Sequence, residues 1–225
     1  MTTEAVRICG LGTRVPEETT LEALIALGEC RVVYCAVEDA RSFAWLKSHG
    51  LPLKKPRNPA EVAAAAAKGG LVGLAVWGHP QFSSAFARET QTLLAKAGLP
   101  FRVYGAISPV GSAFARSVSF LGGDYGYQGI QCYDAETLLA DASALTLRLP
   151  LVVYSEKSAP KRWAALLALL KAKYPADHEA RVYPVGADEE RITTVGALAP
   201  KGLTGAMLLV PPSGGAPKRP HDIAG

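Results

Sequence analysis

The chain has 225 residues, of which 49% are apolar and 20% are charged, and its formal net charge is +4. This length holds one large domain or two small ones with a proper core. The small charge and the scattered basic residues argue against a nucleic-acid partner, and no apolar run approaches the ~20 residues of a membrane span.

The cysteines and the first residues bear on metal content and compartment. Four cysteines show no C-x-x-C spacing, and Cys9 and Cys35 fall in apolar strand-like runs, where a free thiol acts as a small hydrophobe. We therefore expect neither a metal site nor a redox pair. The chain does not open on a basic segment followed by an apolar one, so we expect a cytoplasmic protein without a membrane partner.

Short apolar runs alternate with helical patterns over the first hundred residues. The runs rich in β-branched and aromatic residues predict strands at 5–9, 31–37, 71–77 and 101–104. The intervening patterns predict helices at about 19–28, 39–48, 59–68 and 84–96. Thr19-Thr20-Leu21-Glu22 has the spacing of a capping box, and Ser83 or Ser84 is placed to cap the fourth helix. The alternating order predicts a parallel sheet covered by helices.

The pattern changes after about residue 110. A segment rich in glycine and tyrosine at 122–129 is followed by predicted strands at 149–155, 181–185 and 206–210 and by helices after 133 and at 159–174. We expect two α/β domains with mixed, mostly parallel sheets, at residues 1–108 and 109–210. The tail at 211–225 has almost no core-forming residues and is expected to be disordered.

Two glycine turns follow predicted strands. Gly10-Leu11-Gly12 lacks the third glycine of a dinucleotide fingerprint and precedes the acidic pair Glu17-Glu18, which favours a tight turn over a pyrophosphate site. Gly78-His79-Pro80 stands at the carboxyl end of a buried strand, where parallel sheets place their ligands. The residue types alone indicate an α/β ligand-binding protein.

Taken in order, several segments resemble the class III, or tetrapyrrole (corrin/porphyrin), methylase family. The resemblance rests on VRICGLGTRVPEETTLEAL, AVWGHPQF, GAISPVGSAFA, LPLVVYS and VGADEERITTVGALA, which together span about residues 5 to 210. It implies an enzyme that transfers a methyl group from S-adenosylmethionine, bound in a cleft between two domains of a homodimer.

The resemblance also implies which residues hold the cofactor. Its amino-acid portion is expected at Gly78, His79, Pro80, Phe82 and Ser83, and Ser108 and Pro109 are expected to close one side. The adenine side is expected at Tyr154, Ser155, Gly186 and Ala187. Phe82 and Tyr154 are equally compatible with a core role, and Ser108 with a helix cap.

Within the family the chain is most similar to borosin peptide N-methyltransferases, which methylate backbone amides of a precursor peptide. RVVYCAVEDARSFAWLKS, the GHP turn and IQCYDAETLL resemble borosin segments, but LPLKKPRNPAEVAAAAAKGG stands where borosins carry a tyrosine-rich stretch with an arginine. The methyl acceptor is expected to be a separate precursor peptide. The alternatives are a tetrapyrrole or other small molecule, or a non-catalytic protein that binds the cofactor and serves as a partner.

Candidates for contact with the acceptor are Tyr125, Tyr127 and Tyr133. The first two lie in the glycine-rich segment, which equally suits an interface or a plain loop. The catalytic residues otherwise remain unassigned, because no Ser/His/Asp or Cys/His arrangement can be assembled from the spacing.

Overall fold

The computed structural model describes residues 4–37, 39–82, 84–116, 129–154, 160–184, 190–203 and 206–213. It divides the chain into two units, residues 1–112 and 113–225. The sequence placed the domain boundary between residues 108 and 109, and helix α5 (Pro109–Arg116) spans the division that the structure draws. Of the tail expected to be disordered, residues 214–225 lie outside the described residues.

The first unit contains a five-stranded parallel sheet. Its strands stand in the order β3-β2-β4-β1-β5. Their bounds are β1 (Val6–Gly10), β2 (Val32–Cys35), β3 (Leu53–Lys54), β4 (Val72–Val76) and β5 (Phe101–Tyr104). In the register of the central pair, Ile8 stands beside Leu74 and Cys9 beside Ala75. The predicted parallel sheet is present, with β3 as an additional short edge strand.

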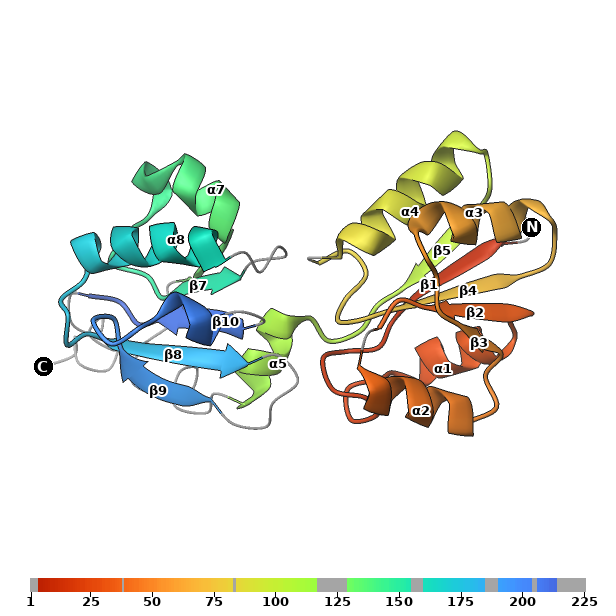
Figure 1. The fold of residues 1–225 in the computed structure, drawn as a ribbon, viewed down its shortest axis with the longest axis horizontal. Coiled ribbons are helices and arrows are strands. Elements are labelled where there is room, and N and C mark those ends of the chain that lie inside the picture. The colour runs from red at the N-terminus through yellow and green to blue at the C-terminus, as the bar shows by residue number, and fades with distance from the viewer. Residues whose placement is uncertain are drawn as a thin grey trace, which may run out of the picture. The chain divides into compact units, whose positions relative to one another are not determined.

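Helices cover both faces of this sheet (Figure 1). Helices α1 (Leu21–Gly28) and α2 (Ala40–Ser48) pack on one face, and α3 (Pro59–Ala67) and α4 (Ala85–Lys96) pack on the other. Side chains alternate along each strand, so Cys9 faces α1 and α2, whereas Ile8 faces α3 and α4. Strands buried on both faces read as continuous apolar runs, which explains why the sequence revealed them.

Side chains of the preceding residues cap these helices. Asp39 caps α2, Asn58 caps α3 and Ser84 caps α4, each through a side-chain oxygen that accepts a backbone N–H of the first turn. The prediction for α1 was wrong by one residue. Thr20 accepts the Ala23 N–H, whereas the Thr19 hydroxyl donates to the carbonyl of Leu11 at 2.8 Å.

The second unit holds a mixed sheet in the order β6-β7-β10-β8-β9. Only β6 and β7 pair in parallel, and the other three pairings are antiparallel. The strands are β6 (Gln131–Asp134), β7 (Leu151–Tyr154), β8 (Glu179–Pro184), β9 (Arg191–Thr194) and β10 (Ala206–Val210). The expected fold class of two α/β domains is confirmed, and parallel pairings predominate over both sheets together.

Helices α7 (Ala135–Ala140) and α8 (Pro160–Lys173) lie over one face of this second sheet (Figure 1). Trp163, Leu166 and Leu170 of α8 pack there against strand residues such as Val153 and Leu208. The described part of this unit also contains two short 3₁₀ turns, at Ala142–Ala144 and Pro200–Leu203. Among the described residues, no helix is long and apolar enough to cross a membrane.

Candidate functional site

The carboxyl ends of the neighbouring strands β1 and β4 lie side by side in the first sheet. The connection that leaves β1 runs through α1 on one face, and the connection that leaves β4 runs through α4 on the other. Open parallel sheets bind their ligands at the carboxyl ends of their strands. The two glycine turns of the sequence follow these two strands.

The two turns are joined directly through their backbones. The N–H of Gly78 donates to the carbonyl oxygen of Gly12 at 2.8 Å, and the two residues form an isolated bridge. Both have positive φ, 75° at Gly12 and 68° at Gly78, a backbone conformation that favours glycine. The sequence predicted a turn at each position, and the structure shows that the turns form a single structure.

The contact between these turns leaves no room for side chains. A Cβ atom on Gly10 would lie 2.5 Å from the carbonyl oxygen of Gly78 and 2.7 Å from Cδ of Pro80. It would also lie 2.8 Å from Cβ of Ala106, in the segment that follows β5. The protein itself therefore fills the space next to Gly10, which supports the expectation that this turn does not cradle a pyrophosphate.

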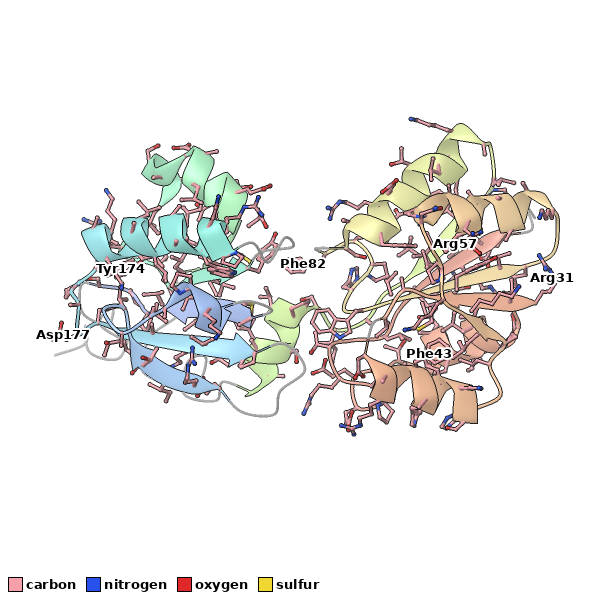
Figure 2. All side chains as sticks on the ribbon, viewed as in Figure 1. Arg31, Phe43, Arg57, Phe82, Tyr174 and Asp177 are labelled. Carbon is pink, nitrogen blue, oxygen red and sulfur yellow. The ribbon has the colours of Figure 1, made fainter. Side chains whose placement is uncertain are left out.

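His79 is half-buried in a turn that its own atoms organise. Its Nδ1 accepts the N–H of Gln81 at 3.2 Å, and its carbonyl accepts the N–H of Phe82 at 3.0 Å. Its Nε2 would lie 3.1 Å from a Cβ on Gly105, so the imidazole packs closely on the segment after β5. Figure 2 shows Phe82 at the carboxyl end of the sheet, opposite the end that holds Arg31.

Ser108 and Pro109 bring the start of α5 to the same place. The N–H of Gly111 donates to Oγ of Ser108 at 3.0 Å, so this hydroxyl caps the helix as well as lying at the candidate site. A Cβ on Gly78 would lie 3.3 Å from Cδ of Pro109. The structure thus brings Gly78, His79 and Pro80 together with Pro109 at one edge of the first unit.

Glu18 is a residue of this edge that the sequence did not identify. It is buried, and its carboxylate accepts hydrogen bonds from the N–H and hydroxyl of Thr13, both at 2.8 Å, and from the Ser112 hydroxyl. Nε of Arg14 lies 3.3 Å away. Burial alone would raise the pKa of this carboxyl, but these hydrogen bonds outweigh burial and hold the pKa below its ordinary value.

No local feature of the sequence separates Glu18 from its neighbour. Glu17 is an exposed carboxylate that pairs with the exposed Arg41, whereas the side chain of Glu18 is only 4% exposed. Glu18 occupies the space beside Gly12. A Cβ added to Gly12 would lie 2.4 Å from the Cβ of Glu18. From the sequence, both acids are interpreted as unfavourable for phosphate binding. Only the fold shows that Glu18 is buried at this edge of the first unit.

The second unit contributes two described candidates. Tyr154 ends β7, is half-buried and stands beside Asp134 of β6. The ring of Tyr133 packs against the core beneath α8, and its hydroxyl donates to the carbonyl of Ala144 at 3.1 Å. These contacts give Tyr133 a structural role, and its contact with an acceptor stays a prediction. Six other candidates lie outside the described residues: Ser83, Tyr125, Tyr127, Ser155, Gly186 and Ala187.

The described residues hold no group of three His, Cys, Asp or Glu side chains that could bind a metal ion. Cys9, Cys30 and Cys35 are buried, and Cys132 is exposed. Burial raises the pKa of Cys30 to about 11 and also raises the pKa of Cys9. A thiol in such surroundings is a poor nucleophile at neutral pH, so the edge of the first sheet remains the candidate site.

Comparisons with known proteins indicate the family of the chain. The model of the family Tetrapyrrole (Corrin/Porphyrin) Methylases matches residues 6–199. A search of curated proteins gave no match. Among solved structures, uroporphyrin-III-C-methyltransferase from Thermus thermophilus is similar, with 23% identity, a TM-score of 0.67 and coverage of 92% of this chain and 94% of that chain.

Two further structures have the same fold. The methyltransferase CobJ is 18% identical with a TM-score of 0.66, and 94% of this chain and 95% of that chain are covered. Cobalt precorrin-4 methyltransferase, CbiF, is also 18% identical with a TM-score of 0.66, and 92% of this chain and 94% of that chain are covered.

Proposed function

The chain belongs to the tetrapyrrole (corrin/porphyrin) methylase family, whose members use S-adenosylmethionine as methyl donor, and from this premise we propose that it methylates backbone amides of a separate precursor peptide. The observation that supports the donor site is the joined pair of glycine turns at the carboxyl ends of β1 and β4. The acceptor class rests on the likeness of the second strand, the GHP turn and the IQCYDAETLL segment to borosins.

The residues at these two turns fit the methyl donor. Gly78 is buried, has positive φ and carries no side chain, so a ligand can approach its backbone closely. The ring of Pro109 offers an uncharged wall beside Gly78, and Pro80 and Ala106 pack close to Gly10. The amino-acid portion of the donor would be held by Gly78, His79, Pro80, Phe82 and Ser83, with Ser108 and Pro109 beside them and Tyr154, Ser155, Gly186 and Ala187 on the adenine side.

Bound S-adenosylmethionine would supply a methyl group on a positively charged sulfur, which an acceptor atom displaces in line. The protein must then position the two reactants and exclude water, and positioning alone contributes much of the acceleration in such reactions. The hydrogen bond from the Gly78 N–H to the Gly12 carbonyl joins the two turns, and Pro109 packs beside Gly78. Turns joined in this way are suited to holding a donor at a fixed distance from its acceptor.

A small-molecule acceptor is the second candidate, and the segment that follows β2 favours it. This segment comes after α2, and where borosins carry tyrosines and an arginine this chain forms the edge strand β3 and the helix α3. Arg57 lies in that segment, is exposed, and binds the carboxylate of Glu61 through its backbone N–H and Nε. The described contacts of Arg57 therefore stabilise the start of α3. An amide nitrogen is a weak nucleophile that needs help in losing its proton, and an electron-rich ring carbon needs less.

Calorimetry tests the donor site. We expect S-adenosylmethionine and its demethylated product to bind the full chain equally well with and without a chelator, and NAD not to bind. If NAD binds and neither S-adenosylmethionine nor its demethylated product does, the proposal that this edge binds the methyl donor is overturned.

Intact-mass measurement tests the acceptor. We expect a small peptide encoded beside this gene to gain the mass of one or more methyl groups when it is co-expressed with the protein. Methylation of a tetrapyrrole in vitro, with the peptide unchanged, would establish the second candidate. Tight donor binding without transfer to either would identify a non-catalytic partner protein.

A further inference from the structure

Thr13, Glu18 and Ser112 form a buried polar cluster at the edge that holds the candidate site. Their exposed fractions are 4%, 6% and 1%. Thr13 and Glu18 belong to the loop after β1, and Ser112 belongs to α5, which follows β5. The hydroxyls of Thr13 and Ser112 lie 3.0 Å apart, and both contact the carboxylate of Glu18. Three residues from two distant segments therefore form one hydrogen-bonded unit.

The carboxylate of Glu18 accepts four hydrogen bonds from within the protein. One oxygen accepts from the N–H and hydroxyl of Thr13, and the other accepts from Ser112 and Arg14. An anion held by this many donors keeps its charge, because each hydrogen bond favours the ionised form. Buried and saturated, Glu18 is suited to holding its donors in place rather than to transferring a proton.

The contacts of the cluster continue to the candidate donor site. Ser112 lies one turn into α5, and its N–H donates to the carbonyl of Ser108 at 2.8 Å. The residue after Ser108 is Pro109, whose ring lies against the open side of Gly78. On the other side, the loop of Thr13 and Glu18 begins at Gly12, which binds the N–H of Gly78. The cluster therefore fixes the two segments that flank Gly78.

We propose that Glu18 is a positioning residue of the donor site, which sets the distance between the Gly12 turn and the start of α5 and thereby the width of the space at Gly78. This inference rests on the proposed function, because it assumes that S-adenosylmethionine binds at this edge. It adds a residue that does not touch the donor and acts through Thr13 and Ser112.

The obvious alternative is a cluster that only stabilises the fold. Loss of a buried hydrogen bond lowers stability wherever it occurs. If the cluster is purely structural, substitutions in it leave the dissociation constant of S-adenosylmethionine unchanged in protein that remains folded. If it positions the donor site, the same substitutions raise that dissociation constant. The affinity of the folded variants therefore decides between the two roles.

The test measures the dissociation constant of S-adenosylmethionine by calorimetry, well below the unfolding temperature, in full-length variants whose near-ultraviolet circular dichroism matches that of the wild type. We expect Glu18→Gln to weaken binding by about tenfold or more, as for a lost hydrogen bond to a charged group. Glu17→Gln is the matched control, since it removes the same charge from the adjacent exposed residue. We expect it to bind like the wild type.

A second pair of variants separates the hydroxyl from the packing. Thr13→Val keeps the shape and removes the donor, so we expect weaker binding. Thr13→Ser keeps the donor and loses a methyl group, so we expect it to recover most of the affinity even where it is less stable. Ser112→Ala should weaken binding and should add little to Glu18→Gln in the double variant, because both act through one contact.

Two results would overturn the proposal and are distinct from failure of the proposed function. If Glu18→Gln is folded and binds within twofold of the wild type, Glu18 has a structural role only. If Glu18→Gln does not fold, wild-type affinity in both Thr13→Val and Ser112→Ala leads to the same conclusion. If the wild type itself binds no S-adenosylmethionine, the proposed function fails first, and the inference fails with it.

Discussion

Two glycines of the first unit share a backbone conformation and differ in their surroundings. Gly78 has φ 68° and Gly98 has φ 65°, but a Cβ on Gly98 meets nothing within 4 Å, whereas one on Gly78 lies 3.3 Å from Pro109. A non-glycine residue in this conformation costs about 1–2 kcal/mol at either position. Comparison of the two positions therefore separates backbone strain from the loss of space at the candidate site.

We expect Gly78→Val to abolish binding of S-adenosylmethionine and Gly98→Val to leave the dissociation constant unchanged. Both variants should lose stability because the backbone strain is shared, and Gly78→Val should lose more because its side chain also meets Pro109. Denaturant unfolding measures the stability and calorimetry measures the affinity. His79→Ala should weaken binding less than Gly78→Val, because it removes a side chain and leaves the backbone of Gly78 accessible to the donor. Tolerance of valine at position 78 would move the donor site away from this turn.

The cysteines give a second test at the scale of single residues. Cys9, Cys30 and Cys35 are buried, whereas Cys132 is exposed. Desolvation raises the pKa of Cys132 as well as the pKa of the other three thiols, so access to the reagent is what distinguishes Cys132. A thiol reagent such as Ellman's reagent should therefore react rapidly with one group, Cys132, and with the other three only after denaturation. Cys132→Ser should remove the rapid phase. Rapid reaction of more than one thiol in the native protein would contradict the described burial.

At the scale of elements, the start of α1 provides a clear prediction. Oγ of Thr20 accepts the N–H of Ala23 at 3.1 Å, which satisfies one of the first N–H groups of the helix. Thr20→Ala should lower the free energy of unfolding by about 1 kcal/mol, and Thr20→Ser should restore most of it. Thr92→Ala is the matched control, because Thr92 is exposed in the interior of α4, where alanine favours the helix. Urea unfolding of the three variants compares them directly.

At the scale of the whole molecule, we propose that the chain forms a homodimer, as the family resemblance implies. The large exposed apolar side chains include Leu21 and Ile25, which are 77% and 65% exposed and stand one turn apart on α1. Light scattering at micromolar concentration should give twice the chain mass of 23.7 kDa. A monomer mass at that concentration would contradict the proposal.

The sequence by itself determined the first unit and most of the second. Strands such as Val72–Val76 are buried on both faces, so their apolar runs are continuous and recognisable. Gly98 and Pro100 after α4, and Pro59 at the start of α3, marked helix ends because their backbone preferences are local. The glycine turns likewise indicated the candidate site, since the carboxyl edge of a parallel sheet is where its ligands bind.

Tertiary structure decided what depends on contacts between distant segments. The strands β3, β6 and β9 are short and lie at sheet edges, so their own residues carry a weak strand pattern and pairing with a neighbour defines them. Thr20 rather than Thr19 caps α1, because Thr19 is bound to Leu11 across the loop. Glu17 and Glu18 are the same residue type in adjacent positions, and only the fold brings Ser112 to one of them. Burial and partners are properties of the packed chain, and no local pattern encodes them.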